Sequence, residues 1–403
     1  MNPAVKFLPY ARQTIDDDDV AAVTKVLRSD WLTTGPEVSA FETELAKVTG
    51  AKFAVACSSG TAALHLAATA AGLGPKDHAI VSAVTFLATA NAVRYVDAEV
   101  LFADADPNNG LSHANHFQAV IDAHPNDKIR ALFPVHLCGQ TTGMEAVSAL
   151  AKTHDFMIIE DASHALGTTY KSSDGHEHSV GGCAHSDLAA FSFHPSKTIA
   201  MGEGGAVTTN DESLYEKLCL NRNHGMDRAR SHFINWELAE AADGTVNPWY
   251  YEMHELGYNY RASDIHCALA LSQLKKLDAF KARRRDLAAL YSRLIAPLAP
   301  NITPLTWVEN VAPVLHLYPV LIDFDAIGFD RASVMVKLRD LGIGTQVHYL
   351  PVNQQPYYRD RYGERDLPGA AKYYARVLAL PFYPALTDAD VERVVEALAG
   401  LIT

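Results

Sequence analysis

Short apolar runs alternate with helix-forming segments between residues 53 and 160, and this alternation constrains the fold more than any other feature. The runs at 53–57 and 156–160 are apolar and short, which is typical of strands buried inside a parallel sheet. Further strands are expected at 79–83, 100–103 and 129–135, with helices ending near 71 and spanning 86–96, 117–123 and 144–153. Right-handed βαβ units of this kind build a mostly parallel sheet covered by helices. Ligands of such sheets gather at the carboxyl ends of the strands.

The rest of the chain is different in character. Residues 211–298 are mainly helical, apart from an irregular segment at 225–257. The last part reads as a smaller α+β unit, with strands expected at 315–322 and 345–349 and helices at 331–341 and 388–401. We therefore expect a large α/β domain over 1–280 and a small C-terminal α+β domain over 281–403.

Composition excludes several classes of function. The 403 residues carry a formal charge of −13, which argues against a nucleic-acid-binding surface. No run is long and apolar enough for a membrane span, and the first residues lack a signal pattern. Five scattered cysteines without CxxC spacing predict reduced thiols, no zinc cluster and a cytoplasmic protein. The acidic residues 16–19 are explained by the first turn of a helix, so no metal site is expected there.

One lysine, Lys197, lies in a loop between two expected strands at 188–193 and 206–210. Glycines follow it at positions 202, 204 and 205. Such a lysine can be a surface cation, a phosphate anchor or an amine that forms a Schiff base with a carbonyl compound. For a single lysine the surface cation is the commonest case, so the other readings need partners elsewhere in the chain.

Candidate partners follow the expected strands. Ser58-Ser-Gly-Thr61 joins a strand to a helix, where free N–H groups and small hydroxyls can hold a phosphate, although simple helix capping is commoner. Asp161 follows the strand at 156–160, and its carboxylate either caps the next segment or pairs with a protonated pyridine nitrogen. Phe86 either packs in the core or stacks on a flat ring, and Ser192 adds a hydroxyl near Lys197. Together these groups fit pyridoxal 5′-phosphate.

Three longer motifs carry a family resemblance. Glu160-Asp-Ala-Ser-His-Ala165, Ser192-Phe-His-Pro-Ser-Lys197 with its glycines, and Gly257-Tyr-Asn-Tyr-Arg261 resemble the DegT-type nucleotide-sugar aminotransferases. These are pyridoxal-phosphate enzymes of the aspartate-aminotransferase-like fold type I, with a large seven-stranded, mostly parallel sheet domain. The resemblance implies that they transfer an amino group, with glutamate as the donor and a keto-sugar nucleotide as the acceptor. It also implies a homodimer with shared active sites.

The same resemblance assigns roles to residues. Lys197 would be the Schiff-base lysine and proton carrier, and Asp161 would pair with the pyridine nitrogen. His164 would lie against the cofactor ring, on which Phe86, from its own position in the chain, could also stack. The phosphate would be held by Ser59, Gly60, Thr61 and Ser192. Asn259 would reach the cofactor of the neighbouring subunit.

Within the family, three segments resemble the branch that aminates UDP-linked 4-keto-6-deoxy sugars at C4 in pseudaminic acid biosynthesis. They are Ser163-His-Ala-Leu-Gly167, His316-Leu-Tyr-Pro319 and Gln346-Val-His-Tyr349. That likeness implies a sugar-nucleotide pocket lined by Tyr10, Asp30, Trp31, Leu32, Thr33, His348 and Tyr349. The segment 226–256, rich in Trp, Tyr and His, is longer than this pattern predicts, which bears on the identity of the sugar.

Alternatives stay open at this point. The sugar could be aminated at C3, or could be linked to dTDP or GDP. A sugar dehydratase of the same fold would have histidine where Lys197 stands, so the lysine argues against it. A regulator that kept the fold and the cofactor but lost turnover is the remaining possibility.

Overall fold

The structure, a computed structural model, describes residues 6–402. The start of the chain, in which the sequence predicts no targeting signal, lies largely outside the described residues. Within the described part, no helix is long and apolar enough to cross a membrane, and no group of three or more acidic, His or Cys side chains could hold a metal ion.

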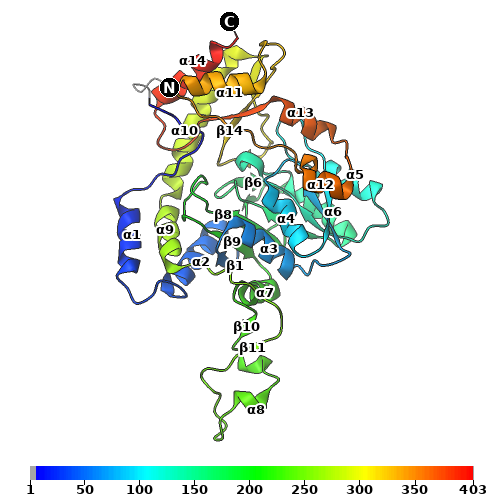
Figure 1. Ribbon diagram of the computed structural model, residues 1–403, viewed down its shortest axis with the longest axis vertical. Coiled ribbons are helices and arrows are strands. Elements are labelled where there is room, and N and C mark those ends of the chain that lie inside the picture. The colour runs from blue at the N-terminus through cyan, green and yellow to red at the C-terminus, as the bar shows by residue number, and fades with distance from the viewer. Residues whose placement is uncertain (1–5, 403) are drawn as a thin grey trace.

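A seven-stranded sheet forms the centre of the molecule (Figure 1). Its strands are β1 (Phe53–Cys57), β2 (His78–Ser82), β3 (Glu99–Ala103), β4 (Ile129–Phe133), β5 (Met157–Asp161), β8 (Leu188–Ser192) and β9 (Gly205–Thr209). They lie in the order β1-β9-β8-β5-β4-β2-β3, and only β9 runs antiparallel to its neighbours. The expected α/β architecture with a mostly parallel sheet of seven strands is confirmed.

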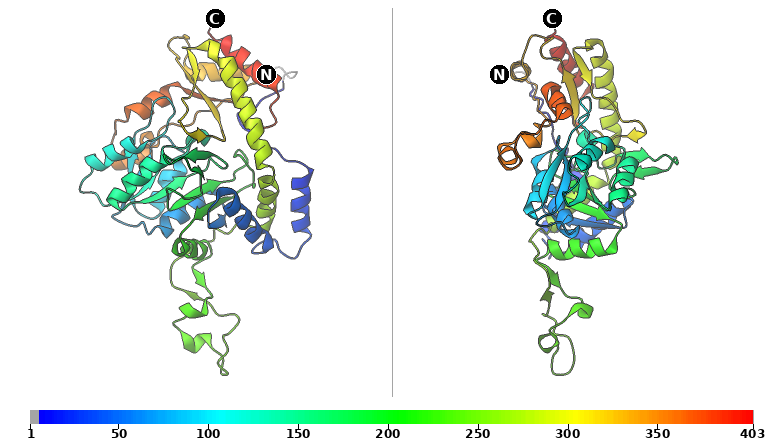
Figure 2. Two further views of the ribbon diagram at one scale, coloured as in Figure 1. Left: turned by 180° about the vertical axis from the view of Figure 1, so that it is seen from behind. Right: turned by 90° about the vertical axis from the view of Figure 1, so that its right-hand side faces the viewer.

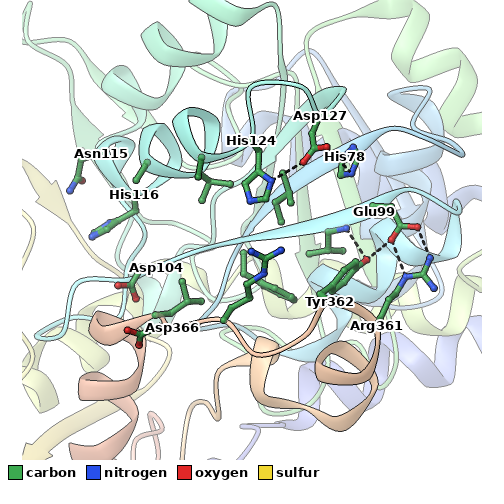
Figure 3. Close-up of a pocket in the computed structure, with 18 residues that line it drawn as sticks. His78, Glu99, Asp104, Asn115, His116, His124, Asp127, Arg361, Tyr362 and Asp366 are labelled. Atoms are coloured by element: carbon green, nitrogen blue, oxygen red, sulfur yellow. Dashed lines mark hydrogen bonds and ion pairs between the residues drawn. The ribbon is translucent and has the colours of Figure 1, made fainter.

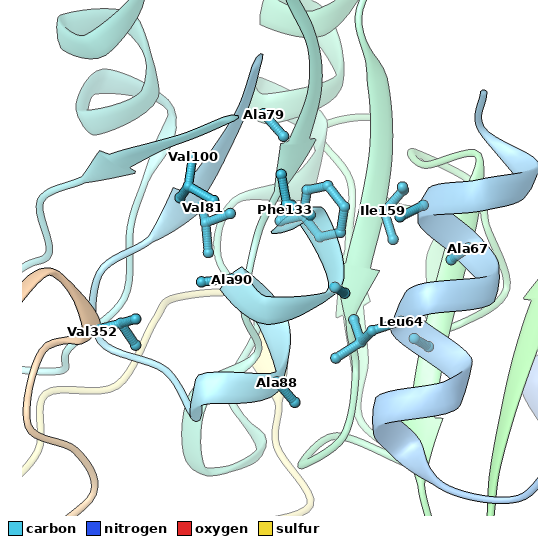
Figure 4. Packing of buried hydrophobic residues seen from close by; sticks show 14 of the residues in the cluster. Leu64, Ala67, Ala79, Val81, Ala88, Ala90, Val100, Phe133, Ile159 and Val352 are labelled. Atoms are coloured by element: carbon cyan, nitrogen blue, oxygen red, sulfur yellow. The ribbon is translucent and has the colours of Figure 1, made fainter. Parts of the chain in front are cut away.

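Helices cover both faces of this sheet, which explains why its strands are mostly apolar. They are α2 (Pro36–Thr49), α3 (Gly60–Ala70), α4 (Leu87–Tyr95), α5 (Ala114–Ala123), α6 (Met144–His154) and α7 (Glu212–Arg222). Neighbouring strand residues enter opposite cores, because side chains alternate along a strand. Val81 belongs to the same buried cluster as Leu64 and Phe133 (Figure 4), whereas Ile80 belongs to a second buried cluster, which also contains Phe41.

Two helices lead from the sheet to the C-terminal part of the chain. They are α9 (Asp264–Leu274), which lies beside α1 (Asp17–Leu27), and the long α10 (Leu277–Ile295) (Figure 1). Asp16 caps α1, and Lys276 pairs with Asp16 and Asp19, so the acidic residues serve the helix as expected. The predicted domain boundary at residue 280 falls inside α10 and stays a prediction.

The C-terminal part has a small antiparallel sheet and its own core. The sheet comprises β12 (Ile302–Pro304), β14 (Tyr318–Ile322) and β15 (Val377–Leu380), with α11 (Arg331–Asp340) and α14 (Asp388–Ala399) packed nearby. Leu8, from the start of the chain, is buried in this core. Further helices and strands are α12 (Pro356–Tyr362), α13 (Pro368–Arg376), β6 (Thr169–Lys171), β7 (Glu177–Ser179) and β13 (Val311–Ala312).

The segment 226–256 forms an arm that projects away from the body of the molecule (Figure 2). It contains the strand pair β10 (Met226–Asp227) and β11 (Glu252–Met253), with α8 (Trp236–Ala239) beyond them. Gly225 and Gly257 lie back to back at its base, where an added Cβ on Gly257 would meet the Gly225 nitrogen at 2.1 Å.

Two expected strands differ in the structure. Residues 345–349 form only a single bridge, between Gln346 and Ala379, because their side chains turn toward a pocket. The strand expected at 315–322 begins only at Tyr318. The backbone of His316 is hydrogen-bonded to Cys138 and Arg284 instead of a neighbouring strand.

Candidate active site

Most of the site residues expected from the sequence line one cavity of about 460 Å³ at the carboxyl ends of the sheet strands. They are Tyr10, Ser59, Gly60, Thr61, Phe86, Asp161, His164, Ser192, Lys197, His348 and Tyr349. Ser59, Phe86, Asp161 and Ser192 meet there because each lies at or just beyond the end of a strand, and β1, β2, β5 and β8 point the same way.

The start of α3 forms one wall of the cavity. Ser59 caps the helix by accepting a hydrogen bond from the Ala62 nitrogen at 3.1 Å. The N–H groups of Gly60 and Thr61 have no hydrogen-bond partner among residues 6–402. Free N–H groups at the positive end of a helix dipole attract anions. This wall therefore fits a phosphate group.

Glycines allow three backbone segments to meet at this wall. A Cβ on Gly205 would lie 2.3 Å from the Ser59 oxygen and 2.8 Å from the Gly60 nitrogen, and one on Gly60 would lie 2.6 Å from the Ser192 Cβ. The close approach brings the Ser192 hydroxyl to the helix start. These segments thus form a cradle that fits the predicted phosphate group. A side chain at Gly60 or Gly205 would push the segments apart.

We expect Gly205→Ala to lower the free energy of unfolding by about 2–3 kcal/mol, because the new methyl group overlaps fixed backbone. Cofactor affinity should fall with it, because Ser59 and Gly60 must move. Chemical denaturation and a cofactor titration measure the two effects. Gly74→Ala is the matched control, since an added Cβ there meets nothing within 4 Å. Equal stability of the two variants would contradict this prediction.

Asp161 is buried and held by a chain of hydroxyl groups. The Thr89 hydroxyl donates to its Oδ2 at 2.6 Å, and the Thr85 and Thr89 oxygens are 2.7 Å apart. The Ser163 nitrogen donates to Oδ1 at 3.1 Å. These contacts fix the carboxylate at the end of β5. Neither threonine was predicted for the site, because Thr85 lies in the loop after β2 and Thr89 lies in α4, where nothing local distinguishes it.

His164 lies among other aromatic groups on the cavity wall. Its Nδ1 accepts a hydrogen bond from the Cys138 nitrogen at 3.2 Å, and its Nε2 lies 3.3 Å from the Tyr349 hydroxyl. The His316 ring, which was not predicted for the site, packs 4.5 Å from the His164 ring. Burial, together with the positive charge of Lys197, holds the pKa of His164 well below its usual range, so the ring is neutral.

Lys197 faces the same cavity without a hydrogen bond or ion pair to its Nζ in the described part of the chain. Removal from water lowers the pKa of Lys197 from 10.5 to about 8, while the negative charge of Asp161 limits the shift. The amine is therefore partly uncharged near neutral pH. An uncharged amine is the form that attacks a carbonyl carbon.

This lowered pKa predicts a pH profile. Between about 8 and 10.5 the folded protein binds fewer protons at Lys197 than the unfolded chain, so the contribution of this group to stability increases with pH there. Acetylation of Lys197 in the cofactor-free protein should show a midpoint near pH 8, measured by mass spectrometry of the peptide. Asp161→Asn should move the midpoint lower, because a negative neighbour is lost. The same lysine in denaturant is the control, and an equal midpoint in both states would contradict the shift.

Five expected residues lie outside this cavity. Asn259 is exposed, and the loop 30–33 lies against the start of α9 through a bridge between Thr33 and Ser263. Trp31 and Leu32 are 55% and 47% exposed. Roles for Asp30, Trp31, Leu32, Thr33 and Asn259 therefore stay predictions.

A larger cavity of about 910 Å³ lies at the β3 edge of the sheet, between α5 and the α12–α13 connection (Figure 3). Several of its charged groups are paired with one another. Glu99 pairs with Arg361 and accepts a hydrogen bond from the Tyr362 hydroxyl at 2.7 Å, and His124 Nδ1 lies 2.8 Å from Asp127. Because these groups are already paired, the smaller cavity around Lys197 is the better candidate active site.

The fold and this site together define a fold-type I aminotransferase, and the sequence matches one family of that class. The chain belongs to the DegT/DnrJ/EryC1/StrS aminotransferase family, whose pattern it matches over residues 13–399. It is a sugar aminotransferase that uses pyridoxal 5′-phosphate as its cofactor and acts on small-molecule substrates.

Individual relatives are similar along almost the whole chain. The spore coat polysaccharide biosynthesis protein SpsC of Bacillus subtilis (strain 168) is 39% identical over 399 residues, covering 98% of this chain and 97% of the relative. Among solved structures, Helicobacter pylori PseC, an aminotransferase involved in pseudaminic acid biosynthesis, has a TM-score of 0.87 at 29% identity, covering 98% of this chain and 99% of the other. DesV of S. venezuelae has a TM-score of 0.84 at 30% identity, with the same coverage.

Proposed function

We propose that this protein transfers an amino group from glutamate to a 4-keto-6-deoxy sugar linked to UDP, giving a 4-amino sugar nucleotide. One observation carries the proposal. Lys197, with a lowered pKa, shares a cavity with the anchored carboxylate of Asp161 and the free N–H groups of α3. An amine, an acid and an anion cradle in one pocket are the groups that this chemistry needs.

Each side chain has a distinct task in this proposal. Gly60, Thr61, Ser59 and Ser192 hold the phosphate, and Asp161 keeps the ring nitrogen protonated. The bound cofactor supplies an electron sink that stabilises a carbanion next to its ring. Lys197 would move a proton between the substrate carbon and the cofactor carbon, acting as base and then as acid. A pKa near 8 suits both steps, because the amine changes charge close to neutral pH.

Neutral aromatic groups form the expected sugar side of the cavity. Burial lowers the pKa of His348 to about 3, so this ring serves as an uncharged hydrogen-bonding group. Tyr10 packs 5.5 Å from His348, and Phe86 lies 6.0 Å from Tyr349, ring centre to ring centre. Rings of this kind can pack against a sugar face. We assign Tyr10, His348 and Tyr349 to the sugar, and Phe86 and His164 to the cofactor ring.

The names of the similar proteins support the kind of product. SpsC is a polysaccharide biosynthesis protein and PseC is an aminotransferase of pseudaminic acid biosynthesis. We propose that this protein likewise makes an amino sugar for a glycan, in the cytoplasm.

The direct test is a turnover assay with the purified protein. Cofactor-loaded protein, glutamate and a panel of UDP-, dTDP- and GDP-keto sugars are incubated, and products are read by mass spectrometry. An amino sugar from a UDP-linked 4-keto sugar supports the proposal. A 3-amino product, or turnover only with dTDP or GDP sugars, changes the substrate, and cofactor binding without any turnover favours the regulator.

A shared active site is the second part of the proposal. Asn259 lies outside the cavity of its own chain, yet it stands between Tyr258 and Tyr260, which pack near α3 beside His65. We propose that it completes the site of the second subunit of a homodimer. Residues 30–33 form an exposed loop. We assign this loop to the sugar pocket on the family resemblance of the sequence.

Complementation tests this arrangement. Lys197→Ala and Asn259→Ala should each be inactive, but refolded mixtures should regain activity, because hybrid dimers contain one site with both residues intact. Two Lys197→Ala chains with different tags are the control for the mixing itself. Mixtures that stay inactive although hybrids form would show that both residues act within one chain.

A further inference from the structure

A small cavity adjoins the active site and shares Lys197 with it. Its volume is about 10 Å³, which suffices for one water-sized group. Its charged lining residues are Arg12, Lys197 and Arg284, with no aspartate or glutamate among the described residues that line it. The charged side chains that line the cavity are therefore all basic.

Arg284 is the most unusual of these residues because it is buried without a counter-ion. Its side chain on α10 is 2% exposed, and its Nη1 donates to the carbonyl oxygens of Leu315 and His316, both at 3.2 Å. Its Nε is buried without a partner, and no carboxylate between residues 6 and 402 pairs with it. Burial lowers the pKa of Arg284 to about 10, so it is charged at neutral pH. A buried charge is costly unless an opposite charge balances it.

A second donor at the cavity also lacks a partner. The Thr14 hydroxyl oxygen is buried and forms no hydrogen bond in the described structure. The neighbouring Gln273 is already committed, because its amide nitrogen donates to the Thr14 carbonyl at 2.9 Å and to Asp19 at 2.7 Å. Two buried donors, from Thr14 and Arg284, thus remain free at one cavity. A group that only accepts hydrogen bonds and carries negative charge satisfies both.

We propose that this cavity is an anion subsite for a carboxylate oxygen of the amino donor. The inference rests on the proposed aminotransferase function and deepens it. Lys197 lines both cavities, and the donor nitrogen must reach the place of the Lys197 amine. In an amino acid a single carbon separates the nitrogen from the α-carboxylate. A donor bound at Lys197 therefore carries its carboxylate to the neighbouring cationic cavity.

The donor half-reaction gives the first test. Cofactor-loaded protein is titrated with glutamate while the absorbance of the cofactor is followed. Thr14→Val should raise half-saturating glutamate about 10-fold and Arg284→Gln about 100-fold, as expected for hydrogen bonds to a charged group. Half-saturation by the keto sugar should not change. Arg285→Gln is the control, because Arg285 is the exposed next residue on α10. Unchanged glutamate saturation in Thr14→Val, a variant that spares the structural bonds of Arg284, overturns the proposal.

A second test needs no turnover. The cofactor-free protein is heated with increasing glutarate, a dicarboxylate without an amine, and separately with sodium chloride. Glutarate should raise the unfolding temperature of the wild type by mass action, but not that of Thr14→Val. If only chloride raises the unfolding temperature, the cavity binds an inorganic anion. If glutarate raises the unfolding temperature of the wild type and of Thr14→Val equally, the cavity holds water. Either result overturns the proposal. If no amino donor alters the cofactor absorbance, the proposed function fails, whereas a Thr14-dependent glutarate response identifies the subsite independently.

Discussion

Replacing Lys197 with alanine is expected to lower turnover by about 1,000-fold or more, the largest effect of any single substitution in this protein. The loss combines a missing nucleophile with a missing acid–base group, and proton transfer alone is worth about 100- to 10,000-fold. The visible absorbance of lysine-linked cofactor should disappear as well. Steady-state kinetics and absorbance spectra of the loaded protein measure the two effects.

The control for this variant is the same substitution at a lysine outside the cavity. Lys171→Ala removes an exposed lysine of β6 and should change neither turnover nor absorbance. Circular dichroism establishes whether both variants are folded. A folded Lys197→Ala protein that keeps turnover within 10-fold of the wild type, a difference of about 1.4 kcal/mol in the activation free energy, would contradict the assignment.

Asp161→Asn is expected to have the second largest effect. The carboxylate is 5% exposed, and removing one member of a buried charge pair costs about 3–5 kcal/mol. Cofactor affinity and turnover together should therefore fall by about 100- to 1,000-fold or more. Affinity is measured by titration of the cofactor-free protein, and turnover under cofactor saturation, so that the two losses are separated.

Thr89→Val tests the support of that carboxylate. The substitution removes the 2.6 Å hydrogen bond from the Thr89 hydroxyl to the Asp161 carboxylate. Cofactor affinity and turnover together should therefore fall by about 10-fold. Thr153→Val, on the exposed face of α6, is the matched control. If Thr89→Val were as severe as Asp161→Asn, the hydroxyl would have a role beyond orienting the carboxylate. If Asp161→Asn kept full affinity and turnover, the carboxylate would have no role toward the cofactor.

The expected strands at 53–57, 79–83 and 100–103 were found within one residue at each end, because apolar runs between helices leave few other arrangements. The expectation at 345–349 was wrong. Its sequence has the composition of a strand, but its backbone forms a single strand-type bridge, between Gln346 and Ala379, and its side chains line the cavity. Contacts between distant segments decided this, and a local pattern does not contain them.

The candidate site divides in the same way. Ser59, Asp161 and Lys197 could be predicted, because parallel strands bring their carboxyl ends to one edge. Thr89 and His316 could not, since Thr89 reaches Asp161 across 72 positions and His316 packs on His164 from beyond the sheet. Their sequence surroundings resemble those of ordinary core residues.

The sequence by itself determined the order of strands and helices, the family motifs and the chemistry of Lys197. Those properties follow from local periodicity and residue type. Only the tertiary structure decided how acidic that lysine is and what lies next to it. Burial lowers the pKa of Lys197 and the charge of Asp161 limits the shift, and α10 places Arg284 against the carbonyl oxygens of Leu315 and His316, with no carboxylate partner within residues 6–402. Both properties depend on the surroundings of a group in three dimensions, and this chain assembles those surroundings from segments far apart in sequence.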